Sequence, residues 1–172
     1  MLDRLPISIR PVSFSERGKT LSGVFEISVL NRLSDMLQDT SGIVEIDVSF
    51  EKEGRVPTIQ GNIKTNLKLE CQVCLCQLEL SIDRNFKLGF VTSLEQADRL
   101  TNDCEPFIME DENISLVELI EDEVLLALPD IPKHDYGCVK RNDEDIAIVD
   151  DEQQLRSDNP FSVLAKLKNT GD

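Results

Sequence analysis

Apolar and polar residues alternate along three segments in the central part of this chain. The even positions are apolar in residues 43–51, the odd positions are mostly apolar in 59–71, and the even positions are apolar again in 76–90. A period of two is typical of strands that bury one face and expose the other. Because short turn sequences separate the three segments, they predict an antiparallel meander. Arg84 interrupts the apolar face of the third strand once, which suggests a bend or a sheet edge at that point.

Residues 115–127 carry the strongest helical signal in the chain. Ser115 and Glu118 form an S-x-x-E capping box, and Pro129 ends the pattern. The apolar stripe of this helix consists of Leu116, Leu119, Ile120, Val124 and Ala127. Its acidic residues, which we expect on a mostly solvated face, are Glu118, Glu121, Asp122 and Glu123. The helix should therefore cover the apolar face of the sheet.

Weaker patterns flank these elements. They predict strands at 5–10, 20–29 and 105–109, a helix at 31–37, and a short helix or loop at 92–104. The predicted fold class is therefore α+β, with an antiparallel, partly closed sheet covered by one main helix. This domain is expected to span residues 1–138. An acidic mobile segment at 139–158 and a short amphipathic segment at 159–172 are expected to follow it.

Composition changes this picture mainly through charge. The chain has 172 residues, with 33 Asp and Glu against 18 Lys and Arg, so its formal net charge is −15. On average this charge repels the phosphates of a nucleic acid and favours a basic protein partner, although it also suits a protein that needs only solubility. The first residues lack a signal-peptide pattern, and no apolar run approaches the length of a membrane span. We therefore expect a cytoplasmic protein that does not bind membranes.

Cysteine residues supply the main candidate chemistry. There are 5 of them, an odd number that favours reduced thiols or metal ligands over a disulfide framework. Cys71 and Cys74 form a C-x2-C pair between the second and third long strands, and His134 and Cys138 form a second pair near two prolines. Two close pairs of such ligands suit a zinc ion, so these four residues are a candidate zinc site. Alternatively, the cysteines are small apolar strand residues and His134 is a surface histidine, and Cys76 competes as a partner for Cys74.

Two further surfaces are candidates for partner contact. Lys64, Lys68 and Lys87 would form a basic stripe for RNA on the polar sheet face, unless they are ordinary lysines on a solvated surface. A protein partner would instead meet the acidic helix face and the C-terminal region. The candidate residues there are Glu121, Asp122, Asp143, Glu144, Asp145, Phe161 and Leu164. Catalysis has little support, because no local motif provides His134 with a nucleophile.

Five blocks of sequence also occur in a characteristic order. They are L-E-C-Q-V-C at 69–74, E-P-F-I at 105–108, E-D-E-V-L-L-A-L-P-D-I-P-K-H at 121–134, Cys138, and N-P-F-S-V-L-A-K-L-K at 159–168. Together they resemble the bacterial YceD family of large ribosomal RNA subunit accumulation proteins, from about Leu5 to Lys168. The resemblance implies a cytoplasmic protein, without established catalytic activity, that supports the synthesis, processing or stability of 23S rRNA. Some relatives carry a second cysteine pair where this chain has His134 and Cys138, which leaves a Cys3His site open here.

We therefore predict a non-enzymatic factor in the biogenesis of the large ribosomal subunit. A basic ribosomal protein or an assembly factor is the favoured partner, and 23S rRNA is the other candidate. Two alternatives remain: a metal-dependent or His134-dependent enzyme that processes rRNA, and a zinc-stabilised protein-interaction module. The enzyme requires cleavage or modification of rRNA by the purified protein, whereas the module requires that a chelator lower its stability.

Overall fold

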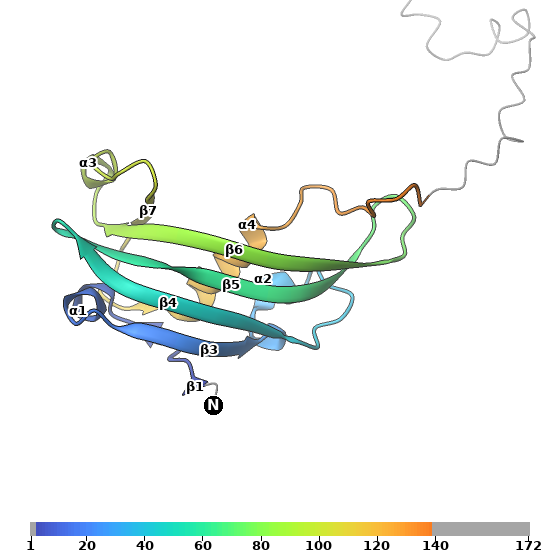
Figure 1. Ribbon diagram of the computed structural model, residues 1–172, viewed down its shortest axis with the longest axis horizontal. Coiled ribbons are helices and arrows are strands. Elements are labelled where there is room, and N and C mark those ends of the chain that lie inside the picture. The colour runs from blue at the N-terminus through green and yellow to red at the C-terminus, as the bar shows by residue number, and fades with distance from the viewer. Residues whose placement is uncertain (1–2, 139–172) are drawn as a thin grey trace, which may run out of the picture. The chain divides into compact units, whose positions relative to one another are not determined.

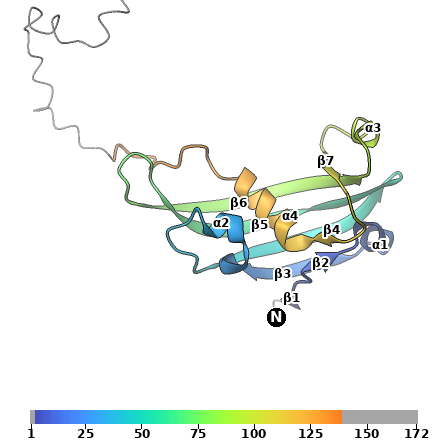
Figure 2. The ribbon, with the colours of Figure 1, turned by 180° about the vertical axis from the view of Figure 1, so that it is seen from behind.

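The computed structural model describes residues 3–138, which form a curved six-stranded sheet with one long helix on its concave face (Figures 1 and 2). The strand order is β1 (Asp3–Arg4), β3 (Thr20–Glu26), β4 (Ile43–Glu53), β5 (Val56–Glu70), β6 (Gln77–Val91) and β7 (Glu105–Ile108). From β3 to β6 neighbouring strands are antiparallel, but β1 is parallel to β3 and β7 is parallel to β6. The α+β class and the single main helix are thus confirmed. The antiparallel meander is confirmed for β4, β5 and β6. The whole sheet is mixed and open rather than partly closed, because the outermost strands β1 and β7 are each parallel to their neighbours.

The three long strands pair in the register that their alternation requires. Ile46 in β4 lies opposite Ile63 in β5, which in turn lies opposite Arg84 in β6. The buried apolar side chains of these strands are Val44, Ile46, Val48, Phe50, Ile59, Ile63, Leu67, Leu69, Ile82, Phe86, Leu88, Phe90 and Val91. Gly61 stands where β4 and β5 approach closely, since a Cβ atom there would lie 2.3 Å from the carbonyl oxygen of Asp47. A larger residue at this position would force the two strands apart.

The main helix, α4 (Leu116–Leu126), begins as the sequence predicts. The hydroxyl oxygen of Ser115 accepts a hydrogen bond from the backbone N–H of Glu118, which satisfies one of the donors left unpaired at a helix start. The apolar stripe packs on the sheet. The expected solvated face is wrong in part, because the side chains of Glu121 and Glu123 are buried, with 4% and 3% of each residue exposed. Glu118 is exposed as expected.

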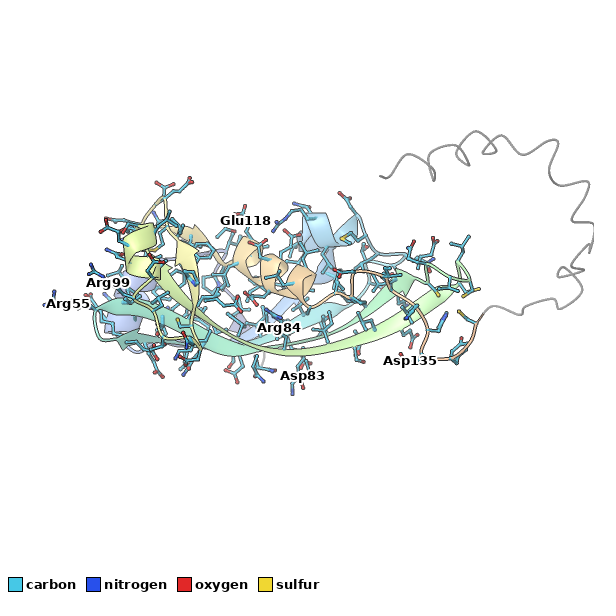
Figure 3. All side chains as sticks on the ribbon, turned by 90° about the horizontal axis from the view of Figure 1, so that it is seen from above. Arg55, Asp83, Arg84, Arg99, Glu118 and Asp135 are labelled. Atoms are coloured by element: carbon cyan, nitrogen blue, oxygen red, sulfur yellow. The ribbon has the colours of Figure 1, made fainter. Side chains whose placement is uncertain are left out.

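Arginine side chains accompany both buried carboxylates. Arg84 Nε donates to Glu123 at 2.9 Å, and Arg32 Nε donates to Glu121 at 2.8 Å. Figure 3 shows Arg84 on the side of β6 that faces α4, and its neighbour Asp83 on the opposite side. Arg84 lies at a sheet edge, as the sequence suggests, because β6 pairs with β5 at this position but with β7 only from Leu88 to Val91. Its side chain interrupts the apolar face because a carboxylate buried on the covering helix requires a charged partner.

Short elements complete the described part of the chain. They are β2 (Ser8–Ile9), which pairs with β8 (Ile114–Ser115), and the helices α1 (Pro11–Glu16), η1 (Ile27–Val29), α2 (Asn31–Ser34) and α3 (Leu94–Ala97). The strand predicted at 5–10 and the helix predicted at 31–37 are thus shorter than expected. Helix α1 was not predicted, because one and a half turns are too short to show a helical period. None of the described helices is both long and apolar enough to cross a membrane.

The segments predicted at 139–158 and 159–172 lie outside the described residues. The same holds for five of the partner-contact candidates, which are Asp143, Glu144, Asp145, Phe161 and Leu164.

Candidate metal centre

The hairpin between β5 and β6 forms one half of the candidate site. The backbone N–H of Cys71 donates to the carbonyl oxygen of Cys76 at 2.9 Å, and the N–H of Leu75 donates to the carbonyl oxygen of Cys71 at 2.9 Å. Leu75 adopts a φ of 59°, a left-handed conformation that residues other than glycine rarely adopt. This tight turn aims the Cys71 and Cys74 side chains to the same side. Strain of this kind persists only where the surrounding structure enforces it.

The chain after α4 supplies the other half. From Leu128 it runs alongside the end of β6 to the hairpin tip, as Figures 1 and 2 show. Pro129 and Pro132 stiffen this path and prevent continuation of the helix. The backbone N–H of Gln72 donates to the carbonyl oxygen of Pro132 at 2.8 Å, which ties the two segments together beside the cysteines.

The four predicted ligands converge where these segments meet. One ligand atom from each of Cys71, Cys74, His134 and Cys138 lies within 4.8 Å of the other three. Cys71 Sγ and Cys138 Sγ are 3.8 Å apart, and Cys74 Sγ and His134 Nδ1 are 3.5 Å apart. Zinc bonds of about 2.3 Å to sulfur and about 2.0 Å to nitrogen imply tetrahedron edges of about 3.8 Å and about 3.5 Å. The donor types and the separations of these two pairs therefore both fit a tetrahedral zinc ion.

A contact of the imidazole ring outside the cluster explains which nitrogen faces the cysteines. His134 Nε2 lies 3.1 Å from the carbonyl oxygen of Gln77, an acceptor that requires a proton on Nε2. Nδ1 then carries a lone pair directed at the cluster, which is the usual arrangement for a histidine that binds a metal. The ring also stacks on Tyr136, with the centroids 4.8 Å apart. Neither contact could be predicted from the sequence, because a backbone carbonyl has no sequence signature and Tyr136 belongs to no metal motif.

The cysteines differ in their electrostatic surroundings. Burial acts to raise the pKa of Cys71, but backbone N–H groups of Cys74, Val73 and His134 lower it to about 6. Burial and hydrogen bonds with the other two thiols raise the pKa of Cys138. The cluster therefore favours a thiolate at Cys71 even without a cation, and thiolate is the form in which cysteine binds metals.

Cys76 lies outside the cluster, although the sequence left it as a competitor. It is exposed, and its sulfur lies 3.5 Å from the backbone carbonyl oxygen of Cys74. A side-chain hydrogen bond with Cys74 raises the pKa of Cys76, but its sulfur is not among the four atoms that converge. Cys76 is therefore a natural control for substitutions at Cys74.

The three lysines of the predicted RNA-binding stripe share the polar face of the sheet, but each forms an ion pair. Their partners are Asp83 for Lys64, Asp39 for Lys68, and Glu53 and Asp103 for Lys87. The side chain of Lys87 is also only 20% exposed. Neutralised lysines of this kind do not make the unpaired basic patch that phosphate binding requires. Neighbouring strands and loops thus place a carboxylate beside each lysine, and RNA binding at the stripe stays a prediction.

Two acidic residues of the predicted partner-binding helix face also lie in the described part. Glu121 is buried, where it accepts hydrogen bonds from Arg32 and from the backbone N–H of Leu33. It is therefore inaccessible to a partner in this structure. The side chain of Asp122 is 49% exposed and pairs with Arg32 at 2.7 Å. Of this pair, only Asp122 could meet a partner at the surface.

Comparison with known proteins places most of the chain within one group. The family model described as Large ribosomal RNA subunit accumulation protein YceD matches residues 59–168, a range that contains the whole Cys3His cluster. A relative in Haemophilus influenzae carries that same name. It is 29% identical over 168 residues, which cover 96% of this chain and 97% of the relative. No solved structure gives a significant match.

Proposed function

The chain belongs to the YceD family of large ribosomal RNA subunit accumulation proteins, and we propose that it supports the accumulation of 23S rRNA in the biogenesis of the large ribosomal subunit. It acts as a non-enzymatic factor on the synthesis, processing or stability of that RNA, through contact with a protein partner. The observation that carries the proposal is the family match over residues 59–168. The relative of the same name adds support, because the similarity extends over 97% of its length.

We further propose that the Cys3His cluster holds a zinc ion. Three thiols and one imidazole are donors that zinc prefers, and the His134–Gln77 hydrogen bond orients the imidazole for such a role. Four protein ligands leave no open position for water, so the ion would act as a structural cross-link between the hairpin tip and residues 128–138. The site would thereby shape a rigid end of the molecule.

A non-enzymatic role is supported by the state of the residues that chemistry would need. Both ring nitrogens of His134 are engaged, one by Cys74 and one by the Gln77 carbonyl oxygen. Burial raises the pKa of the Cys104 thiol, which disfavours its nucleophilic thiolate form. Neither residue therefore resembles an activated catalytic group.

A basic protein partner is favoured over direct contact with RNA. The formal net charge of −15 repels phosphate, and each lysine of the polar sheet face already has a carboxylate partner. A positively charged ribosomal protein or assembly factor would instead be attracted. A tagged pull-down with and without ribonuclease tests this: a ribosomal protein or assembly factor should remain after digestion, and loss of every ribosomal component would contradict it.

Complementation of cells that lack the protein tests the function itself, with the ratio of 23S to 16S rRNA as the readout. The unmodified protein should restore the ratio. Cys74→Ser and Cys138→Ser should fail to do so and should lose bound zinc, measured by plasma mass spectrometry. Cys76→Ser is the matched control and should behave like the unmodified protein, because Cys76 lies outside the cluster.

The outcomes separate the two parts of the proposal. If cells without the protein keep a normal 23S to 16S ratio, the proposed function is wrong. If Cys74→Ser restores the ratio without binding zinc, only the role of the metal is wrong. Cleavage or modification of 23S precursor by the purified, zinc-loaded protein, lost in His134→Ala, would overturn the non-enzymatic assignment.

A further inference from the structure

An apolar groove with acidic residues at its margin lies between α4 and the edge strand β7. Its volume is about 410 Å³, within the range of sites that bind ligands or several side chains. The apolar lining includes Phe107 from β7 and Leu125 and Leu126 from the last turn of α4. Leu126 is 64% exposed, although a leucine of this helix would normally be buried. The groove therefore presents apolar surface that nothing in the described part of the chain covers.

The margin of this groove has an excess of negative charge. Glu105, Asp122 and Glu123 all line it. Arg84 pairs with Glu123 and Arg32 pairs with Asp122, but exposed Glu105 has no ion-pair partner among residues 5–138. Burial raises the pKa of Glu123, the Arg84 hydrogen bond lowers it, and the charges of Glu105 and Asp122 raise it further. The carboxylates at the groove therefore repel one another, and a cation placed among them would relieve that repulsion.

The geometry of the groove restricts which kind of ligand could supply this positive charge. The ligand atoms of these carboxylates do not converge as a metal site would require, since the Cys3His cluster is the only such group in the described residues. The phosphates of RNA would be repelled by the same carboxylates. Strand addition at β7 is also disfavoured, because Pro106 has no backbone N–H to donate. An apolar side chain carried next to a positive one fits both the lining and the margin.

We propose that this groove binds a segment of a protein partner that combines Lys or Arg with large apolar residues. The inference rests on the proposed function, because it identifies the class of partner through which this protein acts in large-subunit biogenesis. Apolar side chains of the segment pack against Leu125, Leu126 and Phe107. Its cationic side chains pair with Glu105 and Asp122, so charge selects the segment and apolar burial holds it.

Site-specific photocrosslinking in cells tests the inference on the full-length protein. A Leu126→p-benzoylphenylalanine substitution places the probe at the groove, and the same substitution at Val29 is the matched control. Val29 is also an exposed apolar residue, at 45%, and it does not line the groove. Mass spectrometry of the crosslinked peptides then identifies the bound segment. The expected product joins position 126, but not position 29, to a Lys/Arg-rich apolar segment of a ribosomal protein or assembly factor.

A charge reversal supplies the second arm. Glu105→Lys should lower the yield of this crosslink by about tenfold, because it replaces an attraction with a repulsion at an exposed margin. Glu45→Lys makes the same change on the polar face of the sheet, outside the groove, and should leave the yield unchanged. An equal yield in the Glu105→Lys protein would overturn the inference.

Three other results would also overturn it: a crosslink to residues 159–168 of the chain itself, a crosslink to a second copy or to RNA, and no product above that of the Val29 control. These failures differ from failure of the proposed function. If Glu105→Lys and a Leu126→Glu variant restore the 23S to 16S ratio as well as the unmodified protein does, the groove inference is wrong while the function stands. If loss of the protein leaves that ratio normal, the function is wrong whatever occupies the groove.

Discussion

Removal of zinc should release residues 128–138 from the hairpin tip and leave the sheet folded. The core under α4 is built from buried apolar residues of the strands and the helix, and none of the four ligands except Cys71 is buried. The metal would thus stabilise one end of the molecule rather than the whole domain. A chelator or Cys74→Ser provides the perturbation.

The size of this effect follows from the other contacts that hold residues 128–138 against the hairpin tip. Ordering about eleven residues costs on the order of 11–22 kcal/mol, and Pro129 and Pro132 place the cost toward the lower limit. The hydrogen bonds Gln72–Pro132 and His134–Gln77 return only about 0.5–1.5 kcal/mol each. Structural zinc sites contribute about 10–16 kcal/mol, which is of the size needed to offset the remainder. Without the metal the segment should therefore detach.

Amide hydrogen exchange measured by NMR gives a direct readout. The N–H of Gln72 has the Pro132 carbonyl oxygen as its acceptor, so its exchange reports on the attachment. With free zinc at a hundredfold excess over the dissociation constant, chelation should accelerate that exchange by about a hundredfold. The amide of Ile63, in the middle of β5, should be unaffected. Cys76→Ser should retain zinc and the protection of Gln72.

Two results would refute this reasoning. Full protection of the Gln72 amide after verified loss of zinc would show that other contacts hold the segment. Loss of protection at Ile63 together with Gln72 would show that the metal supports the whole domain, and that the sheet does not fold independently of it.

Three further predictions concern the sheet and its helix. Arg84→Leu should lower the free energy of unfolding by about 3–5 kcal/mol, because it leaves the carboxylate of Glu123 buried without a partner. In urea unfolding, the double variant that adds Glu123→Leu should recover most of that loss. An equal loss in the single and double variants would contradict the ion-pair explanation. Gly61→Ala should destabilise the protein by about 1–3 kcal/mol in the same assay, because the added Cβ would lie 2.3 Å from a backbone carbonyl oxygen. A neutral effect would show that β4 and β5 separate easily. Hydrogen bonds, of which that from Lys87 contributes most, lower the pKa of Asp103 to about 2. The resulting stabilisation is present above the unfolded pKa of about 3.9 and is lost as pH falls through about 2, so Asp103→Asn should reduce the change in unfolding midpoint between pH 4 and 2. An unchanged acid profile would show that this pair does not contribute.

Much of the fold and the identity of the candidate ligands could be predicted from the chain alone. The alternation of β4, β5 and β6 is a local property, since neighbouring side chains of a strand point to opposite faces. The start of α4 is equally local, because Ser115 caps an N–H only three residues away. The two ligand pairs could be identified because zinc requires particular donor atoms at short spacing.

Only the tertiary structure explains the residues that depart from these patterns. Arg84 interrupts an apolar face because Glu123, 39 residues later, is buried against it, and the lysines of the polar face are neutralised by partners in other strands and loops. Convergence of the ligands likewise depends on pairs separated by 60 and 67 residues, and the groove exists only where α4 meets β7. The physical reason is the distance along the chain over which each of these features acts. Periodicity and capping reflect the backbone geometry of a few successive residues, whereas burial, ion pairing and ligand geometry depend on which distant segments the folded chain brings into contact.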